Sequence, residues 1–339
     1  MKGHSALCEA LGIEVPLICG AMYPCSNPEL VAAVSEAGGI GIVQPLSLSY
    51  VHGHEFREGL HYIRRLTGKP IGVNLIIEQS SKTYLQRVHQ WLDIALQEQV
   101  PFLVTALGNP RWVAERAHAA GVTVYHDVTS RHWAEKALDG GVDGFICVNN
   151  RAGGHAGGMS PEQLLQEIGP LGKPLVCAGG IGTAAGFAEA IAMGYDGAQL
   201  GTRFIATTEC HAHEDYKRAI VEASAEDIVL SEKISGVPVA VINTPCIQHM
   251  GTRAGVLARE QEIRELHQHQ GELEPRVEQL AEQLAADRQA LVEAEQAREV
   301  QQRELEAAQR VVAEVQALLS GKRARAEQIR HRLEGMEKD

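Results

Sequence analysis

The residues best suited to chemistry lie in a glycine-rich loop with one histidine at its centre, Asn150-Arg151-Ala152-Gly153-Gly154-His155-Ala156-Gly157-Gly158. The loop follows the apolar run 144–148, which is typical of a buried strand. An unperturbed imidazole titrates near neutral pH, as a general base should, and the flanking glycines leave His155 little to pack against. We therefore expect His155 to act as an acid/base; the alternative is an ordinary surface-loop histidine.

Two more glycine signals follow apolar runs, Ala178-Gly179-Gly180-Ile181-Gly182 and Leu200-Gly201-Thr202-Arg203. Glycine allows close approach of the backbone to a ligand and positive φ. Exposed N–H groups at a helix start bind a phosphate dianion, and a threonine hydroxyl can add a donor. One such pair alone is more simply a tight turn, but two at consecutive strand ends predict a phosphate site at Gly179, Gly180, Gly201 and Thr202.

The elements that must position these loops alternate between short apolar runs and helical stretches. Continuously apolar strands that alternate with helices indicate a parallel sheet covered on both faces. Eight strands in about 190 residues fit a (β/α)8 TIM barrel, whose active face is formed by the loops after the strands. A doubly wound sheet is the alternative, but it usually has one dominant glycine loop near its start. The expected strands are 16–20, 39–43, 71–75, 102–105, 122–126, 144–148, 174–178 and 197–201.

Helix-start chemistry supports this alternation. Asn27-Pro28, Asn109-Pro110 and Ser160-Pro161 each place a capping residue before a proline at the first helical position. The expected helices are 28–37, 83–97, 110–120, 131–138, 161–168 and 184–193.

The composition changes near Gly255, after which the chain is rich in Glu, Gln, Ala, Arg and Leu and has no aromatic residue. We therefore expect a barrel domain at 1–258 and a helical extension at 259–339. Apolar residues repeat there in steps of four and three, which predicts a coiled coil and possible self-association as a homo-oligomer. A solvated single helix, or a hairpin bent at Ser320-Gly321, is the alternative. The repeat consists of Leu273, Val277, Leu280, Leu284, Leu291, Ala294, Leu305, Ala308, Val312, Val315, Leu319, Ala326, Ile329, Leu333 and Met336.

The bulk composition argues against several function classes. A net charge of −12 disfavours a broad nucleic-acid or anionic-membrane surface. No run of about 18 apolar residues predicts a membrane span, and the first residues do not resemble a signal peptide. Seven scattered cysteines predict buried thiols in a reducing cytoplasm, and none of them has zinc-ligand spacing, so we expect no metal.

Five motifs in consistent order resemble the nitronate monooxygenase family, also called 2-nitropropane dioxygenase. The resemblance covers about residues 10–258. It rests on Gly20-Ala21-Met22, Gly72-Val73-Asn74-Leu75, Ala152-Gly153-Gly154-His155, Ala178-Gly179-Gly180-Ile181 and Gly201-Thr202-Arg203-Phe204. It implies a TIM barrel that binds FMN and oxidises alkyl nitronates or nitroalkanes with O2 to carbonyl compounds and nitrite.

The resemblance also implies roles for individual residues. The backbone of Gly20, Ala21 and Met22 would border the flavin ring, and Asn74 would hydrogen-bond it. Ala152 and Gly153 would line the cofactor site, with His155 over the flavin on the substrate side. His126 ends the fifth expected strand, and we expect it either to contact the cofactor or to support the site from behind.

Two other functions stay open. Related NAD(P)H-dependent flavin reductases, of the enoyl-ACP reductase or NADH:quinone reductase type, share the glycine loops and the histidine. Alternatively, the coiled coil is the working part of a scaffold protein whose barrel binds flavin or is inactive. The chain also departs from the family after about residue 259, where the heptad helix replaces helices that pack back on the barrel.

Overall fold

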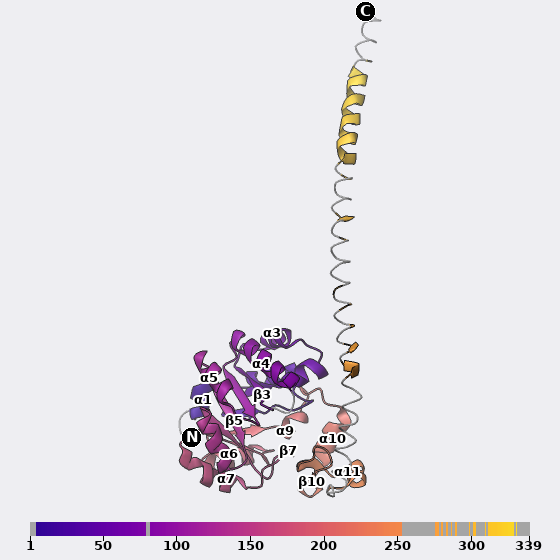
Figure 1. Cartoon of the computed structure of the whole chain (residues 1–339). Coiled ribbons are helices and arrows are strands. Elements are labelled where there is room, and N and C mark those ends of the chain that lie inside the picture. Colours follow the sequence, from indigo (N-terminus) through magenta and orange to yellow (C-terminus); the bar gives the residue numbers. More distant parts are fainter. Residues whose placement is uncertain are drawn as a thin grey trace, which may run out of the picture. The chain divides into compact units, whose positions relative to one another are not determined.

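The computed structural model describes residues 5–78, 82–252, 311–328 and scattered positions between 275 and 330. The chain divides into two units, Met1–Ala254 and Gly255–Asp339, and we describe each by itself (Figure 1). The first unit carries the glycine loops and the candidate histidine.

Eight parallel strands close into a barrel in the order β1-β2-β3-β4-β5-β6-β8-β9, which confirms the expected TIM barrel rather than the doubly wound sheet. The closing pair is β1 with β9, where Ile18 lies opposite Gln199. The strands are β1 (Leu17–Cys19), β2 (Ile40–Val43), β3 (Ile71–Ile76), β4 (Phe102–Ala106), β5 (Thr123–Val128), β6 (Gly144–Val148), β8 (Leu175–Ala178) and β9 (Gly197–Leu200).

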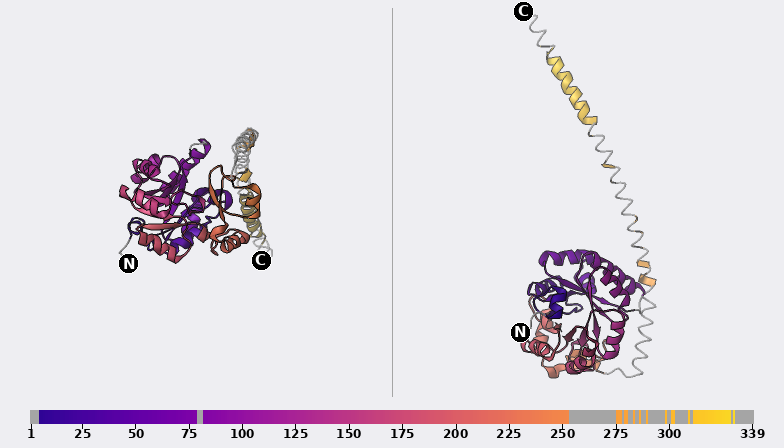
Figure 2. Two further views of the ribbon diagram at one scale, coloured as in Figure 1. Left: turned by 90° about the horizontal axis from the view of Figure 1, so that it is seen from below. Right: turned by 90° about the vertical axis from the view of Figure 1, so that its left-hand side faces the viewer.

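Helices surround the barrel, as the right-hand view of Figure 2 shows. They are α2 (Pro28–Glu36), α3 (Phe56–Leu66), α4 (Lys82–Gln97), α5 (Arg111–Ala119), α6 (Arg131–Asp139), α7 (Pro161–Ile168) and α8 (Ala184–Met193), and α1 (Ala6–Leu11) precedes β1. A π-helical turn, η1 (Ser47–Val51), follows β2, and a 3-10 turn, η2 (Gly169–Leu171), follows α7.

The expected caps act in different ways. Ser160 forms a full capping box with Gln163 at the start of α7. Asn27 makes no capping bond. Instead its Nδ2 donates to the carbonyl oxygen of Glu209 (2.8 Å) and its Oδ1 accepts from the backbone N–H of His211 (3.0 Å). Asn27 therefore ties the start of α2 to a segment more than 180 residues away, a role that its local sequence does not indicate.

The barrel interior is filled in layers. Because the strands of a barrel are tilted, side chains at one height come from alternate strands. Neighbouring layers interlock through glycines: a Cβ at Gly144 would lie 2.4 Å from Cζ of Tyr125, and one at Gly197 would lie 2.5 Å from Cδ2 of Leu7 on α1. From the amino to the carboxyl end, register gives the layers Ile40, Phe102, Gly144 and Gly197; Ile18, Gly72, Tyr125 and Val176; Ile42, Val104, Ile146 and Gln199; and Gly20, Asn74, Asp127 and Ala178.

After the barrel, the first unit continues into a small sheet that we did not expect from the sequence. It contains β10 (Ile228–Ser231), β11 (Val239–Ile242) and β7 (Gly154–His155), in the order β10-β11-β7. The remaining elements of this part are α9 (Thr202–Ile205), α10 (Glu214–Glu222), η3 (Ala225–Asp227) and α11 (Pro245–Met250). The histidine loop is thus paired with a segment that lies about 80 residues later in the chain.

In the second unit, residues 311–328 are helical. The side chains of the heptad residues Val312, Val315 and Leu319 are about half exposed on this helix. Most of the other heptad positions lie outside the described residues, and the coiled coil stays a prediction. Among the described helices, none is long and apolar enough to cross a membrane.

The cysteines resolved in the first unit are free thiols, as the sequence predicts. Six are buried and Cys246 is exposed. Burial raises the pKa of the Cys25 and Cys177 thiols to about 11, so these groups are neutral hydrophobic side chains at physiological pH.

His126 lies on the helix-facing side of β5. It alternates with Tyr125 and Asp127, and it shares its face with Val124 and Val128, which belong to the cluster between strands and helices. Oγ1 of Thr105 donates to the carbonyl oxygen of Tyr125 (3.2 Å) and lies 2.8 Å from Nδ1 of His126, so Nδ1 carries the ring proton. Of its two expected roles, this position favours support of the site from behind.

Burial lowers the pKa of His126 to about 4. Below pH 6.5, the imidazole of His126 is protonated in the unfolded chain but stays neutral in the folded chain. The free energy of unfolding therefore falls as the pH drops from 6.5 towards 4. We expect His126→Asn, which keeps a polar atom near Thr105, to lose up to about 3 kcal/mol less unfolding free energy than the wild type over this pH range. Urea unfolding at pH 7, 5.5 and 4.5 measures it, with the exposed His249→Asn as control. Parallel pH profiles of wild type and His126→Asn would contradict the assignment.

Candidate active site

The carboxyl end of the barrel is lined by its last layer, Gly20, Asn74, Asp127 and Ala178. The layers beneath it are mostly apolar, whereas this one offers an amide and a carboxyl beside two small residues. Asn74 is buried, and its Nδ2 reaches the carbonyl oxygen of Val104 only at 3.4 Å. The layer therefore forms a floor in which two polar side chains lie among small residues.

The loop after β1 closes one side of this floor. The backbone N–H of Gly20 donates to the carbonyl oxygen of Leu200 (2.9 Å), and a Cβ at Gly20 would lie 2.9 Å from Cδ of Gln199. The side chain of Ala21 packs against the barrel-interior cluster. Met22 is held by Ser26, whose Oγ accepts from the Met22 N–H (2.8 Å), so the three residues expected to border a ring are fixed in place.

The glycine turn after β8 depends on a backbone conformation that only glycine adopts readily. Gly179 and Gly180 have φ of 120° and 73°. A Cβ at Gly179 would lie 2.5 Å from Oδ1 of Asn149, and one at Gly180 would lie 2.7 Å from Cβ of Arg151. The turn thus lies directly against the start of the histidine loop.

Asn149, which the sequence analysis did not select, joins these two loops. It is fully buried, its Nδ2 donates to the carbonyl oxygen of Gly179 (3.0 Å), and its Oδ1 accepts from the backbone N–H of Arg151 (2.8 Å). Its carbonyl oxygen also accepts from the N–H of Gly157 (3.2 Å). A polar residue directly after the apolar run 144–148 is the sequence signal that could have identified it.

Two residues of the expected phosphate site, Gly201 and Thr202, lie against other loops at the carboxyl end of the barrel. A Cβ at Gly153 would lie 2.7 Å from Oγ1 of Thr202, and one at Gly201 would lie 3.4 Å from Sδ of Met22. Gly201 is the N-cap of the short helix α9, which begins at Thr202. The ends of β1, β6 and β9 therefore meet around Thr202, while buried Ala152 lies behind Gly153.

His155 is exposed at the edge of the small sheet, where it pairs with Val239 of β11. Its Nε2 lies 3.1 Å from Oγ of Ser235, and that hydroxyl donates to the carbonyl oxygen of Val237 (3.2 Å). With the hydroxyl proton used there, the geometry suits the tautomer in which Nε2 of His155 donates to Ser235 and Nδ1 keeps its lone pair. Sequence reasoning did not identify Ser235, because it lies in a loop without a motif.

Asp127 is a second polar group that the sequence analysis did not select, because no motif includes it. Part of the residue reaches the surface, but Oδ1 is enclosed and has no hydrogen-bond partner among the described residues. Burial raises the pKa of this carboxyl to about 7. A buried polar atom without a partner needs an explanation, and a bound ligand is one.

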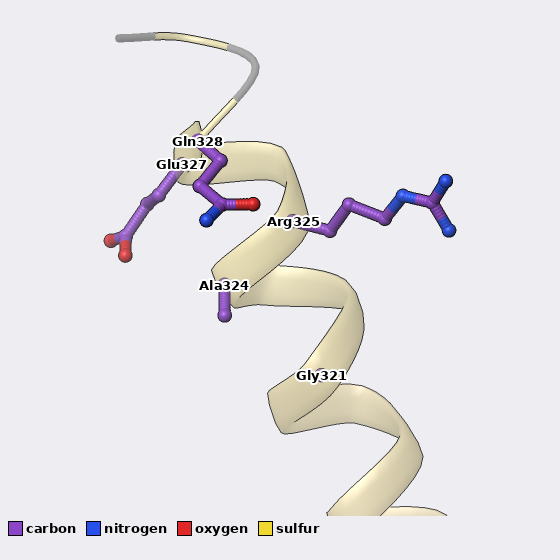
Figure 3. Close-up of a pocket in the computed structure, with 5 residues that line it drawn as sticks. All are labelled: Gly321, Ala324, Arg325, Glu327 and Gln328. Atoms are coloured by element: carbon purple, nitrogen blue, oxygen red, sulfur yellow. The ribbon is translucent and has the colours of Figure 1, made fainter.

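Other places in the described chain do not compete with this site. Within the described residues, no group of three or more potential ligands could hold a metal ion. A hollow on the helical tail is lined by Gly321, Ala324, Arg325, Glu327 and Gln328 (Figure 3). These exposed residues come from one helix, which offers no second wall to enclose a ligand.

Comparison with known proteins agrees with this geometry. The chain is 30% identical over 259 residues to a (3aS,4S,5R,7aS)-5-hydroxy-7a-methyl-1-oxo-octahydro-1H-indene-4-carboxyl-CoA dehydrogenase of Rhodococcus jostii, a match that covers 75% of this chain and 71% of the relative. It is 26% identical to a probable nitronate monooxygenase of Staphylococcus aureus, covering 75% and 82%. The solved structure of FabK from Thermotoga maritima has a TM-score of 0.66 and 31% identity, covering 78% of this chain and 83% of FabK.

The model of one family, nitronate monooxygenase, matches residues 4–316, which include the whole barrel and both glycine turns. With this extent of match, the chain belongs to the nitronate monooxygenase family of oxidoreductases.

Proposed function

We propose that this protein is an FMN-dependent enzyme that oxidises alkyl nitronates with O2 to carbonyl compounds and nitrite. The observation that carries the proposal is the meeting of Gly153 and Thr202 beside the Gly179-Gly180 turn, at the carboxyl end of the barrel. Family membership supports it, since enzymes of this family generally depend on a flavin.

The residues present fit FMN. The backbones of Gly179, Gly180 and Gly201, with the Thr202 hydroxyl, would hold the phosphate. The ring would border Gly20, Ala21 and Met22 above the last barrel layer, where Asn74 makes one long hydrogen bond among the described residues. When bound, FMN supplies the electron chemistry of the oxidation. The residues of this chain bind and orient the ring and the substrate.

His155 would serve on the substrate side. Because Ser235 takes the Nε2 proton in a hydrogen bond, Nδ1 is available to accept the α-proton of a neutral nitroalkane. An already ionised nitronate needs no such base. The same imidazole would therefore matter for one form of the substrate more than for the other.

A second candidate is an NAD(P)H-dependent flavin reductase that acts on an acyl thioester. Its thioester substrate is favoured by the 30% identity to a carboxyl-CoA dehydrogenase, which exceeds the 26% identity to the probable nitronate monooxygenase. Both candidates use the same cofactor site and differ in the source of electrons.

One anaerobic experiment separates the two. We expect the FMN-loaded protein to lose its visible flavin absorbance on mixing with propionate 3-nitronate and to keep it with NADH or NADPH. Bleaching by NADH or NADPH alone would replace the nitronate proposal with the reductase. Failure to bind FMN after reconstitution would overturn both.

The base role has its own prediction. His155→Ala should retain FMN and lose turnover of neutral nitroalkanes by about 100-fold or more, with a much smaller loss on pre-ionised nitronates. Steady-state nitrite release with each substrate form measures the difference. His249→Ala, at an exposed position on α11, is the matched control. Equal losses on both forms would contradict the assignment of His155 as base.

We also propose that the helical extension joins copies of the chain through its heptad residues. The half-exposed side chains of Val312, Val315 and Leu319 support this, since apolar residues at such spacing are commonly covered by a second helix. Truncation after Arg259 should lower the molar mass measured by light scattering to that of one barrel. An unchanged number of subunits would rule out the extension as the assembly element.

A further inference from the structure

Asp127 occupies a position that neither the phosphate site nor the histidine loop explains. It lies in the last barrel layer with Gly20, Asn74 and Ala178, on the inward face of β5. Its inward direction follows from the register, because Asp127 lies opposite inward-facing Ile146 and alternates with outward-facing Val128. The carboxyl therefore belongs to the floor on which the ring of a cofactor would rest.

No described group neutralises a negative charge at this point. The titratable groups on β5 and the adjacent β6 are Tyr125, His126 and Cys147, while β4 offers only Thr105 and Ala106 beside it. Burial lowers the pKa of His126 to about 4 and raises the pKa values of Tyr125 and Cys147, so all three are uncharged at pH 7. Across the layer, Asn74 is also uncharged.

An ionised carboxylate with an enclosed, unpartnered oxygen is costly, because nothing replaces the water that it has lost. A protonated carboxyl avoids that cost and also has one O–H to donate. Asp127 is itself partly exposed at the barrel mouth, where Gly20 and Ala178 present no large side chain, so that a ring can approach the acid. The ring system of FMN carries carbonyl oxygens and ring nitrogens that accept such a hydrogen bond.

We propose that Asp127, carrying its proton, donates a hydrogen bond to the flavin ring over the last barrel layer, so that the chain binds FMN best while this carboxyl is neutral. The proposal rests on the FMN-dependent function above. It adds a proton-linked contact to the ring that is separate from the phosphate site and from His155.

The test is the pH dependence of FMN affinity, measured by the quenching of flavin fluorescence in the full chain from pH 6 to pH 8.5. Above pH 7, the Kd of the wild type should rise relative to that of Asp127→Asn by up to about tenfold for each pH unit. The amide keeps a donor and does not ionise, and taking the ratio cancels the titration of the FMN phosphate. Asp139→Asn, at an exposed carboxylate on α6, is the matched control and should follow the wild type.

Parallel pH profiles of wild type and Asp127→Asn would overturn this contact and leave the proposed function standing. A wild type that does not bind FMN would instead overturn the proposed function, and this inference with it. If Asp127→Asn does not fold, carbon-13 NMR of aspartate-labelled wild type gives the answer. One aspartate carboxyl should titrate near pH 7 without FMN and stop titrating there when FMN is bound. Titration of every aspartate carboxyl in its ordinary acidic range would refute the proposal.

Discussion

The tilt of the barrel strands is the constraint on which the site depends. It sets which residue of each strand faces inward at a given height. Apolar side chains fill the lower layers, and glycines there accept the large rings and branched chains of the neighbouring layers, as Gly144 accepts Tyr125. The last layer lacks large side chains, so the packed core ends in a floor. A shift of one residue in β3 would turn Asn74 towards the helices, and a shift of one residue in β5 would do the same to Asp127.

Above this floor, the loops are held to each other rather than to the helices. Asn149, one buried residue, forms hydrogen bonds to both the histidine loop and the Gly179 turn and so fixes the two together. The small sheet adds a second connection, because β11 pairs with Gly154 and His155. The proposed phosphate site follows β8 and β9. His155, the candidate base, is therefore positioned by Asn149, which precedes these two strands, and by β11, which follows them.

Polar groups near the site differ in what surrounds them. His126 faces the helix layer, where burial keeps it neutral and Thr105 holds its ring. Asp127 faces the barrel mouth, and one of its carboxyl oxygens is enclosed without a partner in the part of the chain that the structure describes. Successive side chains of a strand point to opposite faces. His126 therefore packs within the fold, whereas the neighbouring Asp127 faces the place proposed for a ligand.

The sequence by itself determined the eight strands, their alternation with helices and the glycine motifs, because apolar runs and turn residues are local signals. It also identified the family, since five short motifs in order are specific when taken together. The tertiary structure alone decided which polar residues share a layer. His126 resembled a residue of the site, and Asp127, Asn149 and Ser235 belonged to no motif. The roles of His126, Asn149 and Ser235 arise from contacts between segments 21 to 80 residues apart. The position of Asp127 in its layer follows from strand register, which is a property of the closed barrel rather than of any one segment.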